Sequence, residues 1–327
     1  MRIAALGGIV FVGLGILLVR LWFLQVISEE RYAERADANR LRTIREDAPR
    51  GAIVDRQGRP IVVNRTGLSV VARAQDFQNG EHRGVLNRLA LVLGVPPADL
   101  IDEIKTSVGS PVETVTLKED VDGPTRLYLA ERRRDFPGVR LQETFRRDHP
   151  LNTALAHVVG YTGPITAETL KDYRSRGYLG DETVGTSGLE AQYEKYLAGK
   201  PGEAVAEVDS TGEPRGRQLL SSTAPQQGST LELAIDLPTQ AALAAALEQR
   251  VAESGSPGGA AGVALDPNTG EVLAIASYPT YRPDAFSDGR PREVDRLLKD
   301  ARRPLLNRAV GGLYPAGSAF KVVTAAA

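Results

Sequence analysis

The chain has 327 residues, of which 42% are apolar and 25% charged, values typical of a globular protein large enough for about two domains. Its 40 basic and 41 acidic side chains leave a net charge of −1, which gives no electrostatic basis for binding nucleic acid. The chain has no cysteine, and its three histidines lack metal-ligand spacing, so we exclude thiol chemistry and predict neither a metal nor a cofactor.

An uncharged apolar run, Ile3–Val19, lies at the amino terminus, and apolar residues continue to Ile27. A helix over the shorter run would span about 25 Å and one to Ile27 about 37 Å, against a hydrocarbon core of roughly 30 Å. We therefore predict a single transmembrane anchor over residues 1–27. The alternative is a cleaved signal peptide, but its small-x-small site, Ala36–Ala38, lies in a charged stretch beyond the apolar run.

The next segments predict a stalk followed by alternating short strands and helices. Ser28–Arg45 is charged and compatible with a helix. Ala52–Val54 and Ile61–Val63 flank Asp55-Arg56-Gln57-Gly58, a pattern that predicts a β-hairpin with glycine at a turn position of positive φ. Three further segments complete this part: a strand over Thr66–Ala74 and two helices, Leu86–Leu93 and Pro97–Lys105, on either side of Gly94.

The segment around residue 190 predicts one amphipathic helix. Ser187 and Glu190 have the spacing of a capping box, in which a serine and a glutamate three residues on satisfy free amides at a helix start. Leu189, Tyr193 and Leu197 then form an apolar stripe that Gly199 ends. We interpret this Ser-Gly-Leu-Glu segment as architectural.

The last hundred residues predict a strand, a helix and a hairpin. Leu231–Ile235 alternates as a strand does, and Pro238 suits the first turn of a helix. Its expected buried stripe consists of Leu243, Leu247 and Val251. The segment 261–277 then predicts a second hairpin around an Asp-Pro-Asn-Thr-Gly turn.

Ser318 and Lys321 are the candidate catalytic residues, as nucleophile and general base. They lie three positions apart at a predicted helix start, so the lysine amine can reach the serine hydroxyl. Burial and the helix dipole would favour the neutral amine, which can take the proton and so activate the serine for acyl transfer. The alternative is a helix cap with an exposed lysine. A cation near the positive end of a helix is unfavourable, however, and catalysis gives a reason for it.

Five stretches occur in an order that closely resembles class B penicillin-binding proteins, and the motifs RLWFLQV and ANRLRTI resemble the elongation type more than the division type. The five stretches are APRGAIVDRQGRPIVVN, VGTSGLEAQYEKYLAGKPG, LELAIDLPTQ, GVALDPNTGEVLAIASYPTY and PLLNRAVGGLYPAGSAFK. The Ser-x-x-Lys spacing is also one of the signatures of this superfamily. The resemblance implies an α+β fold with an anchor at 1–27, a stalk and pedestal (dimerisation-type) domain at 28–225, and the beginning of a serine β-lactamase-like transpeptidase domain at 226–327.

The resemblance also implies an activity, partners and a location. The expected reaction is peptidoglycan D,D-transpeptidation, in which Ser318 is acylated by a stem peptide ending in D-Ala-D-Ala, with penicillin as an inhibitor. The expected partners are a SEDS-type glycosyltransferase and elongation scaffold proteins. The expected location is the inner cell membrane, with a single span and most of the chain outside the cytoplasm.

The chain departs from the family in one respect. The later Ser-x-Asn and Lys-Thr-Gly motifs, which provide proton-relay and oxyanion-hole groups, do not occur in it. We therefore expect a truncated chain, inactive on its own, in which the rest of the site lies in a longer product. A membrane-anchored pedestal that binds a glycosyltransferase without catalysis is the alternative function. A free β-lactam hydrolase or sensor is a third, disfavoured by the long pedestal.

Overall fold

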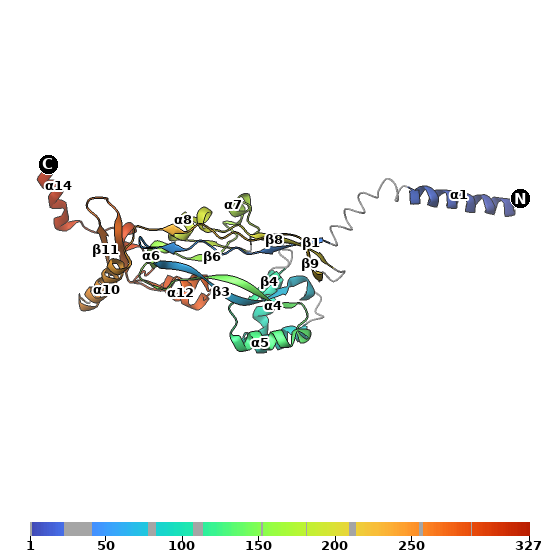
Figure 1. Ribbon diagram of the computed structural model, residues 1–327, viewed down its shortest axis with the longest axis horizontal. Helices are drawn as coiled ribbons and strands as arrows, with labels where there is room; N and C mark the ends of the chain where they lie inside the picture. Colours follow the sequence, from blue (N-terminus) through green and yellow to red (C-terminus); the bar gives the residue numbers. More distant parts are fainter. Residues whose placement is uncertain are drawn as a thin grey trace. The chain divides into compact units, whose positions relative to one another are not determined.

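A computed structural model of the chain describes residues 2–22, 41–77, 83–106, 114–151, 153–180, 182–208, 214–254, 258–288 and 290–327. It confirms the predicted α+β fold (Figure 1). The chain divides into two compact units, one of Met1–Asp47 with Pro201–Gln226 and the other of Ala48–Lys200 with Gln227–Ala327. The alternative cleavage site at Ala36–Ala38 lies outside the described residues.

The first unit contains helix α1 (Arg2–Trp22) and an antiparallel sheet in the order β1 (Leu41–Glu46), β8 (Gly202–Val208), β9 (Pro214–Thr223). Where the structure describes the predicted stalk, the prediction of a helix is wrong. Its last residues form β1, because they pair with β8, which lies far away in the sequence. Among the described helices, none is both long and apolar enough to cross a membrane. The predicted anchor therefore stays a prediction.

The second unit is built on a mixed sheet around β3, which pairs antiparallel with β2, β4 and β5, while β10 pairs parallel with β2. The described strands of this unit are β2 (Ile53–Val54), β3 (Pro60–Arg73), β4 (Thr114–Lys118), β5 (Val139–Asp148), β6 (Thr162–Pro164), β7 (Thr183–Gly185), β10 (Leu231–Glu232), β11 (Ala260–Leu265) and β12 (Val272–Tyr278). The described helices are α3 (Arg83–Leu93), α4 (Pro97–Thr106), α5 (Gly123–Glu131), α6 (Ala156–Val159), α7 (Leu170–Ser175), α8 (Gly188–Gln192), α9 (Glu194–Leu197), α10 (Leu237–Ser254), α11 (Asp284–Ser287), α12 (Pro291–Lys299), α13 (Arg308–Gly311) and α14 (Lys321–Ala326).

Two apolar cores stabilise this unit. In the first, one face of β3 packs against α3, α4 and α5, with Val70 and Leu89 fully buried. In the second, Ile53, Val62 and Leu197 join the hairpin β2–β3 to α9 and to the segment that leads into α10. Because burial of each large aliphatic side chain contributes about 1.5–3 kcal/mol, these cores hold the sheet around β3 together with the helices and segments packed on it.

The predictions are confirmed for elements that pack or pair with their neighbours in the sequence. The hairpin β2–β3 turns at Gly58, which has φ +76°, and α3 and α4 flank Gly94, which has φ +64°. The hairpin β11–β12 forms, and Pro238 lies in the first turn of α10. The strand predicted over Thr66–Ala74 is instead the second half of the longer β3, because β5 pairs with β3 along ten positions.

The single helix predicted after Ser187 is wrong. Two short helices, α8 and α9, meet at Tyr193, which ends one and begins the other. Ser187 is the N-cap residue, but its side chain makes no capping hydrogen bond. Glu190 is fully buried and binds arginines instead of the helix start. The capping box therefore does not form, because the carboxylate has stronger charged partners.

Helix α10 and strand β12 are joined by the side chain of Gln240, which is fully buried. Its amide accepts from the Ile275 nitrogen and donates to the oxygens of Ile275 and Ala154. The predicted stripe along the rest of the helix, Leu243, Leu247 and Val251, is half-buried rather than buried. The predicted strand before α10 is also shorter, because only β10 pairs.

Helix α11 is attached to residues that follow β5. Asp284 is 2.6 Å from His149 Nδ1, and Ser287 Oγ is 3.1 Å from Thr162 Oγ1. Phe286 stacks on Tyr161 with ring centroids 3.9 Å apart. Segments that belong to the amino-terminal and carboxy-terminal halves of the chain thus form one packed body here.

We expect the attachment of α11 to weaken in acid. Burial would raise the pKa of Asp284, but His149, with Arg282 and Arg290, outweighs burial and holds the pKa below its ordinary value of 3.8. A depressed carboxyl pKa contributes stability that is present above pH 3.8 and lost as pH falls below it. Asp284→Asn should therefore flatten the loss of stability below about pH 4, measured by urea unfolding at several pH values. The surface variant Asp295→Asn should keep the wild-type slope; equal slopes for wild type and Asp284→Asn would contradict this prediction.

Candidate active site

Ser318 lies in a tight turn that leads into the last helix. It is the second residue of a 3-10 helix, Gly317–Phe320, and Lys321 begins α14. The main-chain N–H of Lys321 donates to the main-chain oxygen of Ser318, so the two residues lie one turn apart. Gly317 has φ +54°, a conformation that only glycine adopts without strain, and it fixes the direction in which the chain enters this turn.

The side chains of Ser318 and Lys321 are both exposed. Within the part of the chain that the structure describes, neither makes a side-chain hydrogen bond or ion pair, with each other or with a third residue. The roles of nucleophile and general base therefore stay predictions. The structure does place the two residues on consecutive turns of one helical segment, within reach of the same incoming group.

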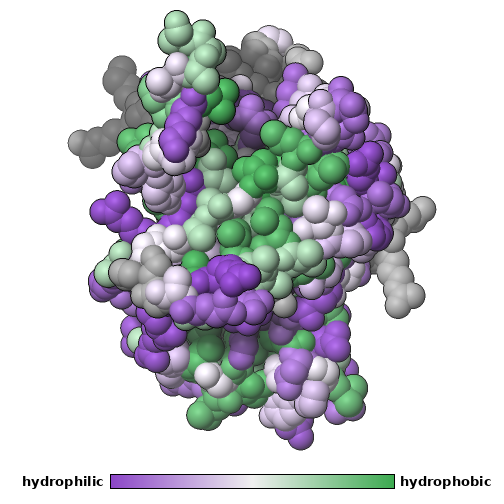
Figure 2. Space-filling model, turned by 90° about the vertical axis from the view of Figure 1, so that its left-hand side faces the viewer, coloured by the Kyte–Doolittle hydropathy of each residue, from purple (hydrophilic) through white to green (hydrophobic). Residues whose placement is uncertain are grey.

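Large apolar side chains of the C-terminal segment and of β11 are largely exposed. Those of the C-terminal segment are Val310, Leu313, Tyr314, Phe320, Val322 and Val323, and β11 adds Val263 and Leu265. Figure 2 faces the side of the second unit that carries α10, β11 and α14, and it shows apolar residues gathered over the middle of that face. A contiguous exposed apolar surface is typical of an interaction surface. Among the described residues, no group of three or more His, Asp or Glu side chains could hold a metal ion.

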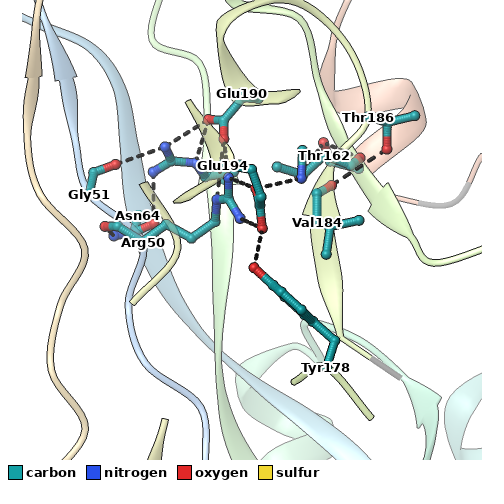
Figure 3. Close-up of polar contacts among 12 residues, drawn as sticks. Arg50, Gly51, Asn64, Thr162, Tyr178, Val184, Thr186, Glu190 and Glu194 are labelled. Atoms are coloured by element: carbon teal, nitrogen blue, oxygen red, sulfur yellow. Dashed lines mark hydrogen bonds and ion pairs between the residues drawn. The ribbon is translucent and has the colours of Figure 1, made fainter. Parts of the chain in front are cut away.

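A buried ion-pair network lies in the same unit, between the segment before β2 and helices α8 and α9 (Figure 3). Arg50 Nη2 is 2.6 Å from Glu190 and 2.7 Å from Glu194. Arg147 binds the other oxygen of Glu190 at 2.7 Å and donates to the Gly51 oxygen at 2.8 Å. Two guanidinium groups and two carboxylates are thus paired with each other, and the network carries no net charge.

Two further polar contacts complete the network. Tyr178 donates to Glu194 at 3.0 Å, and the Gly185 nitrogen donates to the same carboxylate at 2.8 Å. Burial and the charge of Glu194 raise the pKa of Tyr178 well above its ordinary value, so this hydroxyl stays protonated and donates. Burial opposes the charge of Arg50, but Glu190 and Glu194 outweigh it and raise the pKa of Arg50. We interpret the network as structural, because its buried charges neutralise each other and join segments that lie far apart in the sequence.

Sequence reasoning identified some of these residues and missed others. Glu190 belongs to the Ser-Gly-Leu-Glu segment that the sequence predicts to be architectural, and its two arginine partners support that interpretation. Arg147 and Tyr178 were missed. No signal in their local sequence marks them, since each partner lies far away along the chain.

Sequence models of two protein families match the chain. The penicillin-binding protein dimerisation domain matches residues 45–233, and the penicillin binding protein transpeptidase domain matches residues 260–327. Ser318 and Lys321 lie in the second match, and the ion-pair network lies in the first.

Curated relatives are similar along nearly the whole chain. Peptidoglycan D,D-transpeptidase MrdA of Salmonella typhimurium is 32% identical over 98% of this chain and 50% of its own length. MrdA of Escherichia coli is 31% identical over 94% and 48%, and peptidoglycan D,D-transpeptidase FtsI of Escherichia coli is 30% identical over 98% and 49%. The chain thus spans about half the length of the curated relatives it matches.

Two solved structures are also similar to this chain. The complex between penicillin-binding protein PBP2 and MreC from Helicobacter pylori matches with a TM-score of 0.65 and 23% identity, over 86% of this chain and 51% of that one, which shows a shared fold. A structure described as a peptidoglycan synthase complex that coordinates polymerization and crosslinking matches with a TM-score of 0.54 and 35% identity, over 94% and 52%. Since the dimerisation-domain match alone covers more than half of the chain, this protein belongs to the penicillin-binding protein family, with transpeptidase-domain sequence at its C-terminal end.

Proposed function

We propose that the chain is part of a peptidoglycan D,D-transpeptidase that cross-links stem peptides through an acyl-enzyme on Ser318. The observation that carries this proposal is the pair Ser318 and Lys321, one turn apart at a helix start inside the transpeptidase match. The relatives named D,D-transpeptidases, similar over nearly all of this chain, support the same reaction.

The proposed reaction has two steps. In the first, Lys321 accepts the hydroxyl proton of Ser318, whose oxygen attacks the carbonyl between the two terminal D-alanines. The new ester forms as the peptide bond breaks, and D-alanine leaves with a proton on its amine. In the second, an amine of a neighbouring stem peptide attacks the ester, forms the cross-link and returns the proton to Ser318. Penicillin would acylate the same oxygen.

We also propose a role in cell-wall elongation at the inner membrane. The MrdA relatives and the two structural matches, one a PBP2–MreC complex and the other a peptidoglycan synthase complex, support elongation scaffold proteins and a SEDS-type glycosyltransferase as partners. The uncharged run Ile3–Val19 supports a single anchor, with the remainder outside the cytoplasm.

The exposed apolar face around Ser318 supports the expectation that catalysis requires further protein packed against it. The alternative, a pedestal that binds a glycosyltransferase without catalysis, is favoured by the well-paired network of the dimerisation-domain segment, which does not depend on that face.

Labelling with a fluorescent penicillin tests the proposal. The protein with this sequence and the product of the full gene are incubated with the reagent, and the labelled peptide is mapped by mass spectrometry. We expect labelling of the full gene product on Ser318, loss of labelling in Ser318→Ala, and unchanged labelling in Ser175→Ala, which alters an exposed serine of α7. An adduct on a different residue, or no adduct on the full gene product, would contradict the transpeptidase function. The alternative, a pedestal that binds a glycosyltransferase without catalysis, would then be favoured.

A further inference from the structure

The position of Ser318 is not set by contacts of its own side chain, which is exposed and unpartnered among the described residues. The same holds for Lys321. A nucleophile must nevertheless be held within a fraction of an ångström of its productive position, since a displacement of about 1 Å can slow a reaction by roughly 10²-fold. Among the described residues, its position is therefore set by the segment to which this turn is attached.

That segment is attached to the body of the unit by Arg308, the first residue of α13. Its side chain is buried, with 6% of the residue exposed, and its partners are main-chain oxygens. Nε donates to Gly258 at 3.1 Å, Nη1 donates to Arg303 at 3.0 Å, and Nη2 donates to Arg302. One guanidinium thus joins the start of β11 to the loop before α13.

Neighbouring side chains attach the same point to β12 and α6. Ser277 Oγ accepts from the Ala309 nitrogen at 3.2 Å and donates to Asn307 Oδ1 at 3.3 Å. Asn307 Nδ2 donates to the His157 oxygen at 3.4 Å. The start of α13 is therefore held from three directions, by β11, β12 and α6.

Ten residues lead from this anchor to Ser318. At Gly312 an added Cβ would lie 2.4 Å from the Tyr314 ring and 2.6 Å from the Arg308 oxygen, so only glycine fits there. Gly317 follows in its left-handed conformation, and Ser318 comes next. Among the described residues, the hydrogen bonds of Arg308 and Ala309 are the last ones before Ser318 that join this segment to the rest of the unit.

We infer that Arg308 is a positioning residue for Ser318, assisted by Ser277 and Asn307. The inference rests on the proposed function, because it assigns Arg308 a part in the acylation of Ser318. Arg308 does not touch the reacting atoms; it holds the segment that carries them.

Acylation kinetics of the full gene product with a fluorescent penicillin test this role. The concentration dependence of labelling separates non-covalent binding from the acylation rate constant. We expect Arg308→Ala to lower the rate constant by about 10²-fold with binding changed less than about threefold. The rate constant of Arg308→Lys should fall between those of the wild type and Arg308→Ala, because an ammonium has three donors where a guanidinium has five. Ser277→Ala, a milder change, should slow acylation by about threefold to tenfold.

The design separates positioning from folding. Loss of folded protein lowers the amount of protein that labels, but it does not change the rate constant of the molecules that do label. Thr162→Val removes a comparable side-chain hydrogen bond, to Ser287, from another part of the same unit and should leave the rate constant unchanged. If Arg308→Ala yields no folded protein, Arg308→Lys and Ser277→Ala decide. Wild-type rate constants in these variants would overturn the role of Arg308 but leave the proposed function standing. Absence of labelling on Ser318 in the unaltered protein would overturn the proposed function.

Discussion

Replacing Glu190 by alanine is expected to lower the free energy of unfolding by roughly 3–5 kcal/mol, which is the usual cost of removing one partner from a buried ion pair. The Glu190 carboxylate is fully buried and binds both Arg50 and Arg147. Without it, the Arg147 guanidinium, whose side chain is 2% exposed, would keep only neutral partners, Asn64 and the Gly51 oxygen. Since domains are stable by only about 5–15 kcal/mol, this loss is a large share of the total stability.

Urea unfolding followed by circular dichroism measures this loss. Glu190→Gln should be intermediate, because it keeps one acceptor oxygen but places an amide donor against arginine donors. Glu253→Ala is the matched control: Glu253 forms an exposed pair with Arg250 at 2.9 Å on α10, and such pairs contribute about 0–1 kcal/mol. A loss in Glu190→Ala no larger than that in Glu253→Ala would show that the network does not stabilise the fold.

The fold was predictable wherever both partners of an interaction lie close together in the sequence. The hairpins β2–β3 and β11–β12 and the helix pair α3–α4 follow from alternation, periodicity and turn residues that lie within a few positions of each other. Strand β1 was not predictable, because its charged sequence suits a helix and only pairing with β8 makes it a strand. The break between α8 and α9 has a similar cause. Glu190 and Glu194 both turn toward Arg50, which lies 140 or more positions earlier.

For the candidate site, the sequence predicts which residues carry the chemistry but not what holds them. Ser318 and Lys321 are marked by their spacing, which places a lysine near the positive end of a helix. A cation is unfavourable at that position unless it has a function there. Arg308 lies in the same stretch, PLLNRAVGGLYPAGSAFK, yet its contacts are with main-chain oxygens that no side-chain pattern encodes. The sequence does not reveal the role of Arg147 either, since its partners are the distant Glu190 and a main-chain oxygen.

The choice between a general base and a surface lysine is decided by replacing Lys321 in two ways. A positioned general base contributes roughly 10²–10⁴-fold to a reaction rate, so Lys321→Ala should slow acylation of Ser318 by that factor. Lys321→Arg separates the two interpretations, because arginine keeps the charge and length of the side chain but cannot give up its proton to become a base.

If Lys321 accepts the serine proton, Lys321→Arg should be nearly as slow as Lys321→Ala, while non-covalent binding of penicillin and the unfolding temperature stay close to wild type. Lys299→Arg is the matched control, an exposed lysine of α12 paired with Asp295 at 2.7 Å, and it should acylate at the wild-type rate. Acylation within about threefold of wild type in Lys321→Arg would contradict proton transfer to Lys321, since a guanidinium charged at every accessible pH can only attract an anion. The proton of Ser318 would then need a different acceptor, even though the acyl-enzyme still formed on the same oxygen.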